Sequence, residues 1–127
     1  MIDALFNQAN YVATKKMLDV TALRHEAIAS NLANLETPGY KRIDLAPTFN
    51  EQLTQAVAAG DSDGLRQLQP VLSVDTGAVA STRDGNTVQL ENEMLQLSQN
   101  TLANTVETQL VSAALLKLRL AITGRTA

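Results

Sequence analysis

Apolar residues at both ends of the chain recur at alternating spacings of four and three residues, which is typical of helices that pair along a narrow seam. In the first part of the chain the positions with this spacing are Ile2, Phe6, Ala9, Ala13, Lys16, Val20, Leu23, Ala27, Ser30 and Asn34, and seven of these ten are apolar. No Pro or Gly interrupts the stretch. The pattern predicts a long N-terminal helix over residues 1–35, roughly 50 Å in length.

The last third of the chain repeats this pattern. Its positions are Leu90, Met94, Leu97, Thr101, Asn104, Thr108, Val111, Leu115, Leu118 and Ile122. A second apolar stripe, made of Leu95, Leu102, Val106 and Leu110, runs beside the first. Two apolar stripes on one helix indicate more than one neighbour. Asn86 and Gln89 have the spacing of a capping box and Gly124 is a natural stop, so we expect a C-terminal helix over residues 87–123.

The middle of the chain, residues 36–86, has a different character. Thr37-Pro38-Gly39-Tyr40 predicts a tight turn, because Pro presets φ and Gly supplies a positive φ at the next position. Pro47 opens a short helix that Gly60 ends. We expect a loop over residues 61–69 and short extended segments over 70–75 and 78–81. The predicted fold is mainly α: terminal helices 1–35 and 87–123 pair as one coiled-coil-like domain, and residues 36–86 form a variable connecting region.

Composition agrees with this arrangement. The chain has 127 residues, enough for one modest domain. Its apolar content is dominated by 19 Leu and 18 Ala, whereas aromatic residues make up only 3%. Such a chain favours long helices that meet along seams over a thick globular core.

Charge is unevenly distributed around a net value of −3. Residues 44–107 hold two bases and nine acids, and residues 117–127 hold three bases and no acid. Solvated helix faces explain this distribution, and head-to-tail attraction between stacked copies is the alternative. Lys41 and Arg42 beside Tyr40 are too few for a nucleic-acid site in acidic surroundings, so no nucleic-acid partner is expected.

Residues for catalysis, cofactor binding or metal binding are not apparent. There is no cysteine, and the single histidine, His25, adjoins Glu26, which points elsewhere on a helix. Residues 61–64 resemble the start of a calcium loop, but Leu65 and Leu72 occupy positions where oxygen ligands are needed. We therefore expect no enzyme activity, no cofactor and no metal. The N-terminal residues lack a basic region and a long apolar run, so we expect neither a cleaved signal peptide nor a membrane span.

Residues 29–42 carry the most specific pattern in the chain. Ser30, Asn31 and Asn34 place polar groups at the end of the predicted helix, where they must find partners, and the turn follows. The run Ala29, Ser30, Asn31, Leu32, Ala33, Asn34, then Thr37, Pro38, Gly39, Tyr40 and Lys41 resembles the signature of flagellar rod, hook and related axial proteins. Residues 84–88, followed by Leu90-Glu91 and Glu93-Met94, resemble the start of the C-terminal helix in the FlgB family of basal-body rod proteins.

The resemblance implies a structural subunit of the proximal rod of the bacterial flagellar basal body. Such a subunit is exported without a cleaved signal peptide through the flagellar type III apparatus and polymerises in the periplasm into a drive shaft that transmits torque. The partners it implies are copies of the chain itself, the rod protein FlgC, the adaptor FliE, the ring protein FliF and the export gate. A sister rod protein, or a cytosolic helical adaptor or export chaperone, are the alternatives.

Contacts within and between subunits are expected at the apolar seam positions. These are Leu5, Phe6, Ala9, Val20, Leu23, Met94, Leu97, Val111, Leu115, Leu118 and Ile122. We expect Asn31 and Asn34 to form hydrogen bonds where the helix meets the turn, and residues 37–40 to set the direction in which the chain leaves the helix.

Overall fold

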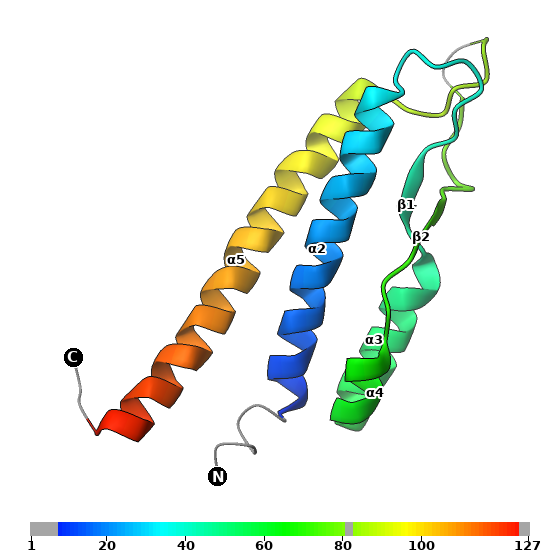
Figure 1. Ribbon diagram of the computed structural model, residues 1–127. Coiled ribbons are helices and arrows are strands. Elements are labelled where there is room, and N and C mark those ends of the chain that lie inside the picture. The colour runs from blue at the N-terminus through cyan, green and yellow to red at the C-terminus, as the bar shows by residue number, and fades with distance from the viewer. Residues whose placement is uncertain (1–7, 81–82, 125–127) are drawn as a thin grey trace.

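The computed structural model describes residues 8–80 and 83–124, and helices dominate it (Figure 1). Its elements in chain order are α2 (Ala9–Ala33), β1 (Ile43–Leu45), α3 (Pro47–Ala59), α4 (Ser62–Gln67), β2 (Leu72–Val74) and α5 (Leu90–Thr123). The prediction of a mainly α fold, with two long helices joined by a short mixed middle, is confirmed.

The two long helices lie side by side and run in opposite directions (Figure 1). α2 lies between α5 on one side and the strands with α3 and α4 on the other. α5 begins at Leu90, later than the predicted start at residue 87, and ends at Gly124, whose φ of 61° forms the expected left-handed cap.

The face of α5 that meets α2 differs from the predicted seam at every second position. Glu93, Asn100 and Glu107 are the buried residues of α5, whereas the adjacent Met94, Thr101 and Thr108 are exposed. The heptad spacing is right, since Leu97, Val111 and Leu118 of the predicted seam are partly buried, but the intervening seam positions lie one residue earlier than predicted. Polar partners on α2 and in the middle region draw the three polar side chains inward.

The apolar core lies on the opposite side of α2. Val20 packs with Leu45 and Phe49, and the partly buried Leu23, Leu53 and Leu68 surround them. Leu65 of α4 is fully buried, and α4 packs against α2. The middle of the chain therefore covers one face of α2 and adds Leu45, Phe49 and Leu65 to the buried apolar side chains of that helix.

The two strands form an antiparallel pair that joins the start and the end of the middle region. Ile43 is opposite Val74 and Leu45 is opposite Leu72. The segment 70–75 was expected to be extended, and β2 lies within it, but β1 was not predicted. Residues 78–80 form no strand, because the chain turns after β2 through a bond from the Ala78 N–H to the Asp75 carbonyl.

α3 follows its sequence signals, since Pro47 occupies the first turn and Gly60 ends the helix with a φ of 66°. The loop predicted over residues 61–69 is wrong, because α4 occupies its centre. The Asp61 carboxylate accepts a bond of 2.8 Å from the Gly64 N–H and so caps this helix. The acidic and glycine residues that resembled a loop are a helix cap.

Candidate functional site

The turn after α2 has the geometry that its residues predict. The Tyr40 N–H donates to the Thr37 carbonyl at 3.2 Å, and Gly39 has a φ of 72°. A positive φ at the third position of such a turn favours glycine strongly. The chain therefore reverses after α2 and returns along the side of that helix as β1.

This turn is joined to the segment that precedes α5. The Gly39 N–H donates to the Asp84 carbonyl at 2.9 Å, and the Thr87 N–H donates to the Tyr40 carbonyl at 3.1 Å. The Lys41 ammonium donates to the Gly85 carbonyl at 2.9 Å. We call residues 30–42 together with residues 84–93 the motif junction, because the two most specific sequence patterns of the chain meet there.

Asn86, in the segment before α5, forms hydrogen bonds to the end of α2. Its side-chain Nδ2 lies 2.9 Å from each of three carbonyl oxygens, those of Asn34, Leu35 and Thr37. Its Oδ1 accepts from the Val88 N–H at 2.8 Å. The capping box predicted for Asn86 and Gln89 is wrong, since α5 begins after Gln89 without a side-chain cap. Asn86 instead satisfies carbonyls left free where α2 ends.

Asn31 connects α2 to both neighbouring segments. Its Nδ2 donates to the Ile43 carbonyl at 2.9 Å and to the Glu93 carboxylate at 3.2 Å. Its Oδ1 accepts from the Ile43 N–H at 3.0 Å. Asn31 is fully buried. The hydrogen bonds of its side-chain amide therefore fix the positions of α2, β1 and α5 relative to each other.

Asn34 and Ser30 close the last turn of α2. The Asn34 amide donates to the Ser30 carbonyl at 2.9 Å, and its oxygen accepts from the Thr37 hydroxyl at 3.2 Å. The hydroxyls of Ser30 and Tyr40 lie 3.1 Å apart. The polar groups of the signature are thus bonded to one another across the turn.

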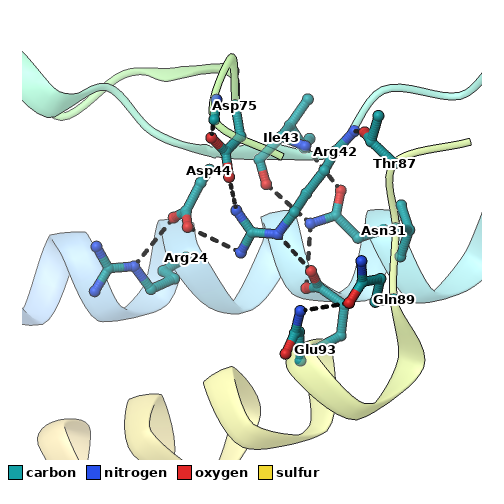
Figure 2. A network of polar contacts seen from close by, with 12 residues as sticks. Arg24, Asn31, Arg42, Ile43, Asp44, Asp75, Thr87, Gln89 and Glu93 are labelled. Atoms are coloured by element: carbon teal, nitrogen blue, oxygen red, sulfur yellow. Dashed lines mark hydrogen bonds and ion pairs between the residues drawn. The ribbon is translucent and has the colours of Figure 1, made fainter. Parts of the chain in front are cut away.

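Arg42 is the centre of a partly buried ionic cluster (Figure 2). Its guanidinium lies 2.6 Å from Glu93, 2.9 Å from Asp44 and 2.7 Å from Asp75. Asp44 also pairs with Arg24 of α2 at 3.2 Å. The cluster links α2, β1, the segment after β2 and α5, and Glu93 within it is 0% exposed.

Local electrostatics keep Arg42 and Asp44 charged. Burial alone would lower the pKa of Arg42, but hydrogen bonds and attraction from Glu93 and Asp44 outweigh burial and raise that pKa. Burial opposes ionisation of Asp44, yet the Leu45 N–H and Arg42 hold its pKa below the ordinary value. The sequence indicates Arg42 only as part of a small basic patch beside Tyr40. The acids that bind it follow it at separations of 2, 33 and 51 residues, so no local pattern could reveal the cluster.

A second group of polar residues ties the middle of α2 to α5. The Thr21 carbonyl accepts from Asn100 at 2.8 Å, and its hydroxyl lies 3.1 Å from both Glu107 and Asn104. Burial raises the pKa of Glu107, although the Thr21 hydrogen bond and Arg24 oppose that rise. Within the described part of the chain, the side-chain oxygen of Asn100 is buried without a partner.

The opposite side of α5 carries apolar side chains that the described residues leave exposed. The second stripe is exposed throughout: Leu95 at 56%, Leu102 at 66%, Val106 at 48% and Leu110 at 56%. We call these four residues the outer face of α5. Leu90, Met94, Leu115, Leu116 and Ile122 are also exposed.

The remaining predicted positions are distributed as follows. Val20 and Leu23 lie in the apolar cluster with the middle region. Ala9, Leu32, Leu97, Val111 and Leu118 are partly buried, whereas Ala29, Ala33, Thr37, Pro38, Gly39 and Lys41 are exposed. Leu5 and Phe6 lie outside the described residues. Contacts between subunits at these positions stay a prediction.

Over residues 8–80 and 83–124, no cluster of His, Cys, Asp or Glu has the arrangement needed to hold a metal ion. None of the helices described there combines the length and the apolar character that a membrane crossing needs. The described residues form a hydrogen-bonded corner beside a helix face with exposed apolar side chains, which suits packing against other proteins.

Comparison with known proteins agrees with the sequence patterns. The family described as "Flagella basal body rod protein" matches residues 18–41, which include the whole signature. The flagellar basal body rod protein FlgB of Aeromonas hydrophila is 32% identical over 101 residues, covering 67% of this chain and 70% of that protein. FlgB of Aquifex aeolicus is 30% identical over 116 residues, covering 87% and 90%. FlgB of Borrelia hermsii is 30% identical over 103 residues, covering 67% and 74%. The chain therefore belongs to the FlgB family of flagellar basal body rod proteins.

Proposed function

We propose that this chain is a structural, non-catalytic subunit of the proximal rod, which polymerises through its terminal helices into the torque-transmitting shaft. The observation that carries this proposal is the outer face of α5, where Leu95, Leu102, Val106 and Leu110 are each about half exposed or more. An exposed apolar stripe of this kind marks a surface that another protein covers. Helices 1–35 and 87–123 would then form one axial domain, with residues 36–86 as its connecting region.

The motif junction supports the same role. A shaft that transmits torque needs its helices held at a fixed angle, and Asn31, Asn86 and Arg42 each bond to several segments at that end of the molecule. These bonds are buried or partly buried, where an unpaired polar group costs free energy. The motif junction would therefore keep α2 and α5 in one register while neighbouring subunits exert torque on them.

Location and partners follow from the same proposal. The chain would be exported without a cleaved signal peptide through the flagellar type III apparatus and would assemble in the periplasm. Its partners would be copies of itself, the rod protein FlgC, the adaptor FliE, the ring protein FliF and the export gate.

The test uses a strain that lacks this chain and receives tagged variants. Leu102→Glu combined with Val106→Glu places two charges on the outer face of α5. We expect the variant to be made but to be absent from purified basal bodies, and the cells not to swim. Val79→Glu is the matched control, because Val79 is 75% exposed and lies outside the helices, and it should restore swimming.

Two outcomes would contradict the proposal. One is normal swimming with the doubly charged variant, since the outer face would then have no role in assembly. The other is a wild-type chain that remains in the cytoplasmic fraction and never purifies with basal bodies, which would favour an adaptor or chaperone.

A further inference from the structure

The outer face of α5 is free of charge. Between Met94 and Leu116 the one charged residue is Glu107, and it is buried against Thr21 on the inner side of the helix. An exposed helix face without charged residues has the composition found at the centre of protein interfaces. Its occupant must therefore present an uncharged surface as well, because burying an unpaired charge there would be costly.

The same chain presents a groove without Lys, Arg, Asp or Glu in its lining at the same level of the helix pair. The groove has a volume of about 430 Å³ and is lined by Thr21, Ala22 and His25 of α2 and by Asn100, Thr101 and Asn104 of α5. None of these residues carries a permanent charge. Thr101 and Asn104 lie on the same turns of α5 as Leu102 and Val106 but face the α2 side, so groove and outer face are different surfaces of one segment.

Asn100 gives the groove a hydrogen-bond acceptor that has no donor among the described residues. It is 5% exposed and lines the groove, its amide donates to the Thr21 carbonyl, and its oxygen has no partner among the described residues. A buried acceptor of this kind is stabilised when a donor reaches it. The exposed glutamines Gln99 and Gln109, on the outer side of α5, would bring such donors with the stripe.

Resting on the proposed function, we propose that the outer face of α5 in one copy docks into the α2–α5 groove of a second copy in the same orientation and at the same level. Leucine and valine side chains enter the space beside Ala22, and an amide donor reaches the Asn100 oxygen. Because the outer face and the groove are different surfaces, a row of copies joined in this way has a free outer face at one end and a free groove at the other. Such a head-to-tail contact propagates, whereas a symmetric contact stops at a dimer.

The chain contains no cysteine, which makes disulfide cross-linking decisive. The Ala22→Cys and Leu102→Cys chains, each with its own tag, are made in the same cells. Basal bodies are purified from these cells and oxidised mildly. We expect a covalent heterodimer that carries both tags on a non-reducing gel. The double variant, with both cysteines in one chain, should yield a ladder of oligomers. Val79→Cys replaces Leu102→Cys in the control and should yield no heterodimer.

The outcomes separate this inference from the proposed function. If both variants enter basal bodies and Leu102→Cys cross-links only to itself, the outer faces meet each other and the inference is wrong. If both variants enter and no cross-link forms, another protein covers the outer face, and the inference is again wrong while the rod assignment stands. Failure of even the wild-type chain to enter basal bodies would overturn both.

Discussion

At the scale of single residues, a few polar side chains decide how the segments meet. Asn31, Asn86 and Arg42 are buried, and each bonds to groups far away in the sequence. Buried polar groups of this kind specify one arrangement, because any other arrangement leaves them without partners. The motif junction is therefore held by buried polar bonds and by the turn within it, and substitutions at Arg42 and Gly39 test these two features.

Arg42→Met should be strongly destabilising. It removes the partner of Glu93, which is 0% exposed, and leaves that carboxylate buried without its cation. We expect the free energy of unfolding to fall by about 3–5 kcal/mol, measured by urea denaturation. Arg66→Met is the matched control, because the Arg66–Asp63 pair is exposed, and it should cost less than about 1 kcal/mol. Similar small losses for both variants would contradict the central role of Arg42.

Gly39→Val tests the turn. Gly39 has a φ of 72°, and a Cβ added there would meet no atom within 4 Å. The cost is therefore conformational rather than steric, and we expect about 1–2 kcal/mol of destabilisation and reduced incorporation into rods. Gly39→Asn should cost less, since Asn tolerates a positive φ better. Equal stability of the Val, Asn and wild-type chains in urea would refute the turn assignment.

At the scale of elements, the contact between α2 and α5 is polar where a coiled coil would be apolar. Heptad spacing on α5 predicted a helix pair correctly, but Glu93, Asn100 and Glu107 occupy the inner positions. Periodicity shows that a helix has a repeated face, while the partner decides which face turns inward. Thr21 supplies that partner for Asn100 and Glu107.

Glu107 makes the helix contact sensitive to pH. Burial raises its pKa, so the folded chain holds this proton more tightly than the unfolded chain. Its contribution to stability is fully present below the unfolded pKa and is lost as pH rises through the folded pKa. Glu107→Gln should therefore raise the urea midpoint relative to wild type at pH 7, and this advantage should disappear at acidic pH. A variant less stable than wild type at pH 7 would contradict this.

Asp44→Asn should show the opposite sign. Its pKa is lowered chiefly by the Leu45 N–H and by Arg42, against the effect of burial. Asp44 therefore contributes stability above its unfolded pKa, and this contribution is lost as pH falls through the folded pKa. The variant should be less stable than wild type at pH 7, with the difference narrowing as the pH falls. Matching urea midpoints across this whole range would argue against the Asp44–Arg42 pair.

At the scale of the whole molecule, burial is unequal on the two sides of α2. The core of Val20, Leu45 and Phe49 lies on the side of the middle region, whereas the outer face of α5 stays exposed. Isolated helices are marginal in water unless packing supports them. The end of α5 beyond the polar contact should therefore gain order when copies associate.

Circular dichroism over a range of protein concentrations checks this expectation. Helix content should be incomplete in dilute protein and should rise with concentration, while Leu102→Glu should reduce the rise. Val79→Glu should leave it unchanged, because that residue lies outside the helices. Near-complete helix content with a sharp, concentration-independent melt at micromolar protein would contradict the expectation.

The sequence by itself determined the two long helices, the turn at residues 37–40, the ends of α3 and the family, because each depends on local spacing, Pro and Gly geometry, or an unbroken motif. Only the tertiary structure decided the pairing of β1 with β2, the inner face of α5, the capping role of Asp61 and the cluster around Arg42. The physical reason is that these features depend on which polar groups meet after folding. Arg42 and Glu93 are 51 residues apart in the chain, and no periodicity carries information over that separation.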